Sequence, residues 1–283
     1  MSFKTKANKD AQRTIHYLKN YTPTPFSIHS VELDFDLAPN KTLVESTLEI
    51  VNDNQAVEDL VLNGEGLTLL SIELNGKPLP KDAFILTEDL LTIYAVPCNC
   101  TLKTLVEISP IDNKSLNGLY VSNNSFATQC EPHGFRGITY FLDRPDVLTT
   151  FRCRITADKA QYPLLLSNGN LVDSAAHDNG KHWVEWHDPS LKPCYLFALV
   201  AGDFDVVSDT FVTMSGRKVL LKVYVEPGKE SQAHFALYSL KEAMRWDEAV
   251  YQREYDLDIY MIVAVSDFNF GAMENKGLNI FND

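Results

Sequence analysis

The sequence lacks any uninterrupted apolar stretch long enough to span a bilayer. No run approaches the roughly 18 apolar residues at which a transmembrane helix becomes a candidate. The first 18 residues carry basic side chains but no apolar core segment, so they do not match a secretion signal. We therefore expect no membrane span, and we expect residues 1–14 to form a disordered arm.

Basic side chains are scarce. The chain has 25 Lys and Arg residues against 38 Asp and Glu residues, which gives a net charge of −13. Phosphate binding requires a basic face, so nucleic acid and anionic membranes are disfavoured as partners. The plain interpretation of the acidic excess is solubility, although a positively charged peptide N-terminus would also be attracted.

Cysteine is also scarce, and its number is odd. The five cysteines have no spacing typical of a disulfide framework, and Cys98 and Cys100 are too close together for the usual metal or redox pair. Reduced, mostly buried thiols in a cytoplasmic protein fit this usage best. Apolar residues make up 45% of the 283 positions, which is enough for a core that needs no disulfide or metal.

The segment from residue 28 to residue 200 has the pattern of many short strands. Residues 31–37 alternate apolar and acidic side chains, as in a strand with one buried face. Asn75 and Gly76 form a hairpin turn signal between two apolar runs. Further strands are expected at 43–51, 90–96, 101–108, 151–157, 164–167 and 182–186. Without intervening helices, this pattern predicts an antiparallel β-sandwich or saddle over residues 15–203.

The pattern changes near residue 204. Residues 219–225 and 278–281 read as strands, and the nearly continuous apolar run at 259–265 predicts a strand buried on both faces. Residues 231–251 predict a helix with Ser231 as N-cap. Its expected apolar register is Phe235, Leu237, Leu240, Met244 and Val250. We expect residues 204–283 to be the incomplete start of an α/β domain, because one helix cannot cover both faces of a sheet.

Complete catalytic motifs are missing. The chain has no His-Glu-x-x-His, no Gly-x-Ser-x-Gly, no phosphate loop and no Gly-x-Gly-x-x-Gly. His182 and His187 have the wrong spacing for a zinc helix and lie in a strand-like segment. From these absences alone the chain would be a binding module.

Residues 270–276 are the exception, because a Gly-Ala pair and a glutamate follow a buried strand there. Gly271 and Ala272 would let another backbone approach closely, and Glu274 would place a carboxylate beside it. One interpretation is a strand edge that aligns a peptide and receives its charge. The other is a loop glycine followed by a solvated glutamate, which the spacing alone favours.

The sequence Gly-Ala-Met-Glu-Asn at 271–275 resembles the exopeptidase signature of the gluzincin zinc aminopeptidases, in the bacterial aminopeptidase N (alanyl aminopeptidase) branch. Six further segments resemble that branch in the same order: 128–131, 137–146, 165–169, 192–203, 255–265 and 275–282. The resemblance runs from about residue 15 to the end of the chain. It implies a β-domain that caps the active site, followed by a thermolysin-like domain that supplies the zinc.

The resemblance also implies roles for individual residues. Glu131 and Glu274 match glutamates that bind the free α-amino group of the substrate, and Gln129 matches a residue that lines the pocket for the first side chain. Gly271 and Ala272 match backbone contacts to the peptide, and Met273 and Asn275 belong to the same motif. Phe270 stands where close bacterial relatives often have Met, next to that pocket. This difference leaves the preference for the first side chain open.

Two carboxylates suit a peptidase that acts on chain ends. Only a chain end carries an ammonium group, and an internal peptide bond would leave both carboxylates desolvated and unpaired. Leaving a buried charge without its partner typically costs about 2–5 kcal/mol, which is enough to select chain ends over internal peptide bonds. In the resembled family, the zinc is bound by the His-Glu-x-x-His motif and a downstream glutamate, and a glutamate of the motif acts as the base. We therefore expect this chain to hold no metal and to be inactive alone, and we expect it to self-associate through the exposed faces of its incomplete domain.

Three alternatives remain. A lipid-epoxide hydrolase of the same superfamily would usually carry Gly-Gly-Met-Glu-Asn, so Ala272 argues against it. A non-catalytic scaffold derived from the peptidase would not need Glu131 and Glu274. A free-standing β-sandwich binding domain does not explain the ordered matches through Asn282. The expected parent activity is removal of N-terminal residues from peptides, with broad preference for Ala, basic and other neutral residues.

Overall fold

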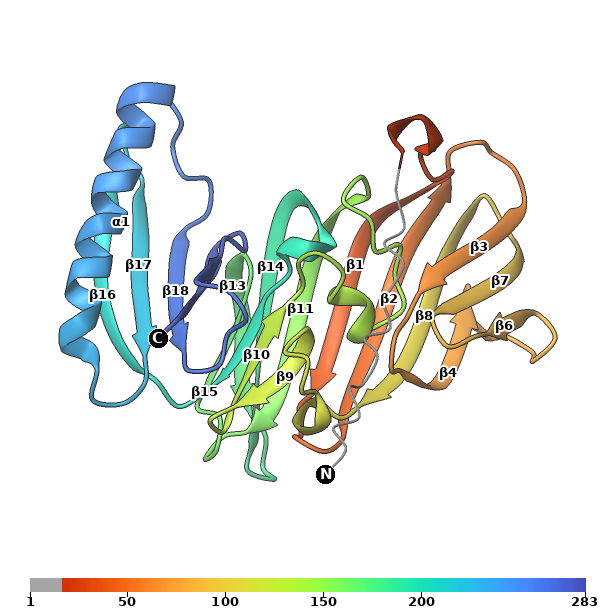
Figure 1. Ribbon diagram of the computed structural model, residues 1–283, viewed down its shortest axis with the longest axis horizontal. Coiled ribbons are helices and arrows are strands. Elements are labelled where there is room, and N and C mark those ends of the chain that lie inside the picture. The colour runs from red at the N-terminus through yellow and green to blue at the C-terminus, as the bar shows by residue number, and fades with distance from the viewer. Residues whose placement is uncertain (1–16) are drawn as a thin grey trace, which may run out of the picture.

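The computed structural model of the protein describes residues 17–283 (Figure 1). The expected disordered arm over residues 1–14 lies outside the described residues. The structure is mainly β, as the sequence predicted. The one α-helix within residues 17–283, α1 (Glu230–Tyr251), lies at one end of the long axis (Figure 1). Within residues 17–283, no helix is both long and apolar enough to cross a bilayer.

The largest sheet forms the body of the molecule. Its eight strands are, in spatial order, β13 (Asn170–Ala176), β14 (Lys181–Pro193), β11 (Leu148–Asp158), β1 (Phe26–Asp36), β2 (Thr42–Asn52), β8 (Asn99–Ile108), β4 (Thr68–Leu74) and β5 (Lys77–Pro78). The Asn75-Gly76 hairpin is confirmed: both residues have positive φ, and Leu74 pairs with Lys77. The sheet is antiparallel, as expected, except at one place. β1 and β11 pair in parallel, because a long excursion of the chain separates them.

Two smaller sheets pack against this body. One consists of β12 (Leu164–Ser167), β15 (Leu199–Gly202), β10 (Ser125–Gln129) and β9 (Gly118–Ser122). The other consists of β3 (Glu58–Asn63), β7 (Leu90–Val96) and β6 (Phe84–Leu86). Short 3₁₀ helices lie at Leu18–Asn20, Pro110–Asp112, Phe135–Gly137 and Cys194–Leu196.

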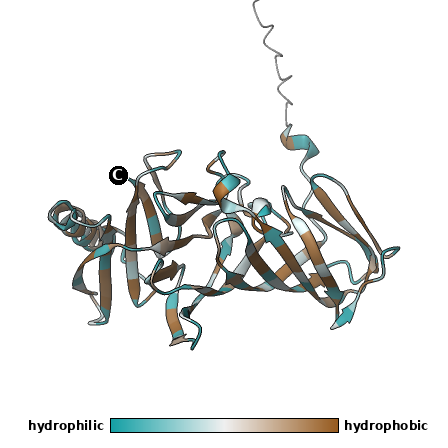
Figure 2. Cartoon of the chain, turned by 90° about the horizontal axis from the view of Figure 1, so that it is seen from below, coloured by the Kyte–Doolittle hydropathy of each residue, from teal (hydrophilic) through white to brown (hydrophobic). Residues whose placement is uncertain are grey.

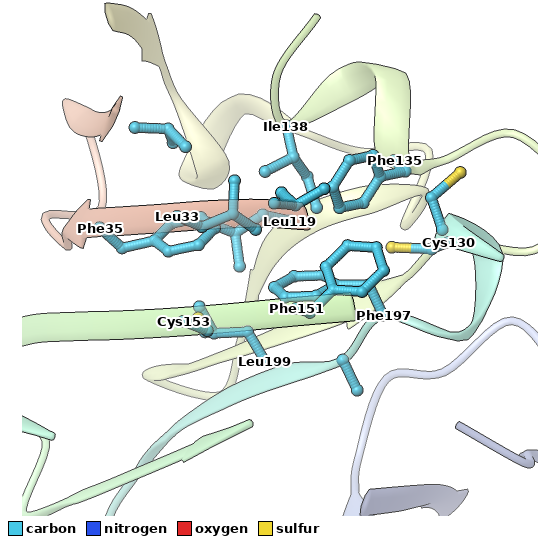
Figure 3. Packing of buried hydrophobic residues seen from close by; sticks show 14 of the residues in the cluster. Leu33, Phe35, Leu119, Cys130, Phe135, Ile138, Phe151, Cys153, Phe197 and Leu199 are labelled. Carbon is cyan, nitrogen blue, oxygen red and sulfur yellow. The ribbon is translucent and has the colours of Figure 1, made fainter. Parts of the chain in front are cut away.

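An aromatic cluster occupies the centre of the core (Figure 3). The rings of Phe135, Phe151 and Phe197 come from a 3₁₀ helix, β11 and the loop before β15, with centroids 5.3–5.9 Å apart. Edge-to-face contacts at this spacing add to the free energy gained by burial. All five cysteines are free, and four of them are buried, as the sequence predicted.

The last sheet contains β16 (Asp205–Val212), β17 (Lys218–Val225), β18 (Ile259–Val265), β20 (Leu278–Asn282) and β19 (Ala272–Met273) in that order. β17, α1 and β18 form a parallel crossover unit. One face of this sheet shares a continuous hydrophobic core with the preceding sheets, through residues such as Met261 and Ile280. The other face packs under α1 (Figure 2).

Two details of this sheet differ from the sequence-based expectation. β18 is not buried on both faces, because Tyr260, Ile262 and Ala264 are only partly covered by α1. Ser231 is not the N-cap, because α1 begins at Glu230 and Lys229 precedes it without a side-chain cap. The expected apolar register is wrong at Phe235 and Val250, which are 75% and 53% exposed, whereas Leu237, Leu240 and Met244 are buried.

Candidate functional site

The Gly-Ala-Met-Glu-Asn segment lies at the edge of the five-stranded sheet. Within the described chain, β19 pairs only with β20, with Ala272 opposite Phe281 and Met273 opposite Ile280. The backbone N–H of Asn282 donates to the carbonyl of Gly271 at 3.0 Å and extends this pairing. The outer side of β19 is therefore free to accept an extended peptide as an additional strand.

The segment that leads into this edge is fixed to β9. The hydroxyls of Tyr120 and Ser122 donate to the backbone oxygen and the carboxylate of Asp267, both at 2.9 Å. Burial raises the pKa of Tyr120, so its phenol remains a donor at neutral pH. The amide of Asn269 donates to the carbonyls of Ser115 and Leu116. Sequence reasoning missed these anchors, because Asp267 and Asn269 look like ordinary solvated loop residues.

Gln129 joins the two halves of the candidate site. Its side chain is fully buried at the end of β10, and its Nε2 atom contacts the sulfur of Met273 at 3.7 Å. The same nitrogen donates to the carbonyl of Glu131 at 3.1 Å. The side-chain amide of Gln129 thus contacts both Glu131 and Met273, which are far apart in sequence. Its Oε1 atom has no partner among residues 17–283.

The two candidate carboxylates flank this contact. Glu131 lies in the turn after β10, which the N–H of Gly134 closes by donating to Cys130, and Glu274 directly follows Met273. Both side chains are exposed, and neither forms an ion pair within residues 17–283. Both are therefore available to a cation that arrives from outside.

The remaining candidates divide into exposed and buried residues. Phe270 is 52% exposed, and Gly271 has no atom within 4 Å of the position where a Cβ would stand. Ala272 is exposed on the strand edge, and Met273 is buried against Gln129. Asn275 is buried, yet neither polar atom of its side chain has a partner in the described chain. Buried amide groups without a hydrogen-bond partner destabilise a protein. The side chain of Asn275 and the Oε1 atom of Gln129 are both of this kind.

Residues 17–283 contain no group of three or more His, Cys, Asp or Glu side chains placed to hold a metal ion. The two carboxylates of the candidate site, with a buried glutamine and a thioether beside them, do not form a zinc ligand set. These residues can bind a cation and align a backbone.

Comparison with known proteins identifies both parts of the chain. Residues 19–196 match the peptidase M1 N-terminal domain, and residues 235–283 match the peptidase family M1 domain. Aminopeptidase N of Caulobacter vibrioides is 56% identical and aminopeptidase N of Escherichia coli is 53% identical, each over 94% of this chain. The chain spans 31% and 30% of the length of these two relatives.

Solved structures agree with these matches. Legionella pneumophila aminopeptidase A, in complex with aspartic acid, superposes with a TM-score of 0.89 at 36% identity, covering 94% of this chain and 32% of its own. An M1 zinc metallopeptidase from Deinococcus radiodurans shares the fold, with a TM-score of 0.72 at 16% identity over 90% of this chain and 60% of its own. With more than half of its length matched by the N-terminal family model, the chain belongs to peptidase family M1.

Proposed function

We propose that this chain forms the N-terminal part of a zinc aminopeptidase and supplies the recognition of substrate ends. One observation carries the proposal. The contact between Gln129 and Met273 brings the turn with Glu131 to the open strand edge that precedes Glu274. A peptide added along β19 would then present its N-terminus to two unpaired carboxylates.

Each residue has a specific part in this proposal. Glu131 and Glu274 bind the α-ammonium group, because charge-assisted hydrogen bonds to ammonium are stronger than neutral ones. Gly271 and Ala272 align the peptide backbone. Gln129, Phe270, Met273 and Asn275 shape the space for the first side chain. The reaction of the parent enzyme is removal of N-terminal residues, with broad preference for Ala, basic and other neutral residues.

Zinc belongs to a part of the parent enzyme that these 283 residues do not supply. We propose a recognition domain over residues 15–203 and the start of a catalytic domain over residues 204–283. The chain by itself has no zinc motif and should therefore be inactive. In the parent enzyme, bound zinc would polarise the scissile carbonyl and activate water.

Partners and location follow from the same proposal. The partners are peptide N-termini rather than nucleic acid or membranes, in keeping with the acidic net charge. Four buried free thiols are in keeping with a cytoplasmic location. The isolated chain should self-associate with a second copy, because an apolar groove of about 490 Å³ lies open between α1 and the neighbouring strands.

The test uses the full-length enzyme and an alanine anilide substrate. Glu274→Gln and Glu131→Gln should each lower kcat/KM by about 10²-fold. Each variant removes one of the two negative charges that bind the ammonium group of the substrate. Glu88→Gln is the matched control, since Glu88 is exposed in the loop between β6 and β7. An unchanged kcat/KM in either site variant would remove that glutamate from the proposed site.

A further inference from the structure

A second cleft opens where the large sheet meets the five-stranded sheet. It has a volume of about 600 Å³ and lies between β12, β13 and β14 on one side and β17 and β18 on the other. Figure 1 shows β13 and β14 beside β18 at this junction. The volume is in the range of ligand-binding pockets. None of the candidate substrate residues lines this cleft.

The walls of the cleft are largely apolar. Leu164, Leu165 and Trp186 form one wall, and Leu220, Tyr224 and Ile259 form the other. The polar groups of the first wall are satisfied internally, because the indole N–H of Trp186 donates to the carbonyl of Leu165 at 3.0 Å. Burial raises the pKa of Tyr224 to about 12, so its phenol is uncharged at neutral pH.

Two cations at the cleft lack a counter-charge. Lys222 is half-buried on β17 between Leu220 and Tyr224, and Lys159 follows the end of β11. Neither ammonium group lies within 4.0 Å of a carboxylate in the described chain.

The one carboxylate that lines the cleft is already engaged. Asp258 accepts a hydrogen bond from Arg217 at 3.2 Å through one oxygen and from Asn170 at 3.1 Å through the other. The neighbouring His182 is likewise engaged, with its Nε2 atom 2.7 Å from the carbonyl of Tyr162. The cleft therefore combines apolar walls with two uncompensated positive charges.

We propose that this cleft binds an amphipathic anion, a medium-chain carboxylate. The alkyl chain lies against the leucine and tryptophan wall, and the carboxylate pairs with Lys222 and Lys159. Apolar burial favours the chain in proportion to its length, and the ammonium groups select the charged head over a neutral one. A short carboxylate lacks the apolar contacts, and a long-chain alcohol lacks the charge.

Tryptophan fluorescence reports binding directly. Two of the three tryptophans, Trp183 and Trp186, line the cleft, and the third, Trp246, is exposed on α1. The purified Trp246→Phe chain is titrated with decanoate, decanol and acetate below the concentration at which micelles form. We expect a saturable change with decanoate, at least tenfold weaker binding of decanol, and no change with acetate.

Variants at the cations complete the test. Lys222→Met should weaken decanoate binding by about tenfold or more, and Lys222→Arg should retain it. Lys218→Met is the control, because Lys218 is exposed on the same strand and does not line the cleft. Circular dichroism verifies folding, and Lys159→Met provides a second variant if Lys222→Met does not fold. Equal affinity for decanoate and decanol, or no saturable signal, overturns the proposal.

Discussion

Three glycines show how different constraints act on one residue type. Gly169 has φ +94°, and a Cβ there would stand 2.2 Å from the carbonyl oxygen of His187. Gly216 has φ +89° but open space around it. Gly271 has open space and lies outside the positive-φ region, so nothing in the described chain requires a glycine there. In the proposed function, its missing side chain allows a peptide backbone to approach from outside.

We expect Gly169→Ala to lower the free energy of unfolding by about 3 kcal/mol or more, because backbone strain and a clash add together. Gly216→Ala should lower the free energy of unfolding by about 1 kcal/mol, since it introduces backbone strain without a clash. Gly271→Ala should leave stability within about 0.5 kcal/mol yet lower kcat/KM of the full-length enzyme about tenfold. Urea unfolding and steady-state kinetics measure both quantities. A loss of stability in Gly271→Ala without a kinetic change would assign this glycine a structural role.

The sequence suggests candidate residues but says little about their surroundings. Resemblance suggests Glu131, Glu274 and the 271–275 segment, whereas spacing alone favours a plain loop. The sequence could not predict that Gln129 contacts Met273, because the contact joins residues 144 positions apart. The anchoring of Asp267 by Tyr120 and Ser122 was equally hidden, since a loop aspartate carries the same local signal with or without a partner.

Among the elements, α1 shows where local pattern and packing disagree. Its buried residues are Ala233, Leu237, Leu240 and Met244, whereas Phe235 points into solvent. A helix buries the stripe that meets its sheet, and hydrophobicity alone does not identify that stripe when apolar residues occur on more than one face.

Leu237→Ala should lower the free energy of unfolding by about 2–4 kcal/mol, because it opens a cavity between α1 and the sheet. Phe235→Ala is the matched control on the same helix and should change it by less than about 0.5 kcal/mol. Both variants introduce alanine, so the introduced residue has the same helix propensity in each case. Denaturant unfolding of the two chains distinguishes them, and equal losses would contradict the placement of α1.

At the scale of the molecule, the two parts of the chain share one core. Asn168 donates to the carbonyls of Leu196 and Lys276 at 3.0 and 2.7 Å, and so ties the β-body to the segment after Asn275. Among residues 17–283, only α1 covers the opposite face of the last sheet, and the apolar groove beside this helix remains open. The side of the sheet that faces the body is therefore complete, whereas the side under α1 is only partly covered.

The open groove predicts association of the 283-residue chain with a second copy, because apolar surface of this kind is rarely left exposed. Ala243→Glu places a charge on the groove wall and should shift the chain toward monomer, whereas Ala249→Glu on the same helix lies away from the groove and should not. Sedimentation velocity at increasing concentration measures the distribution. A chain that stays monomeric at high concentration contradicts the prediction.

The sequence by itself determined the fold class, the strand and turn positions with strong local periodicity, the family resemblance and the absence of a zinc motif. Local pattern and short motifs suffice for these properties, because alternation, Asn-Gly turns and motif spacing act over a few residues. Only the tertiary structure decided the parallel pairing of β1 with β11, the solvent-facing side of α1, and the place of the Gly-Ala-Met-Glu-Asn segment at a free edge. Each of these depends on contacts between residues far apart in the chain, which no local pattern encodes.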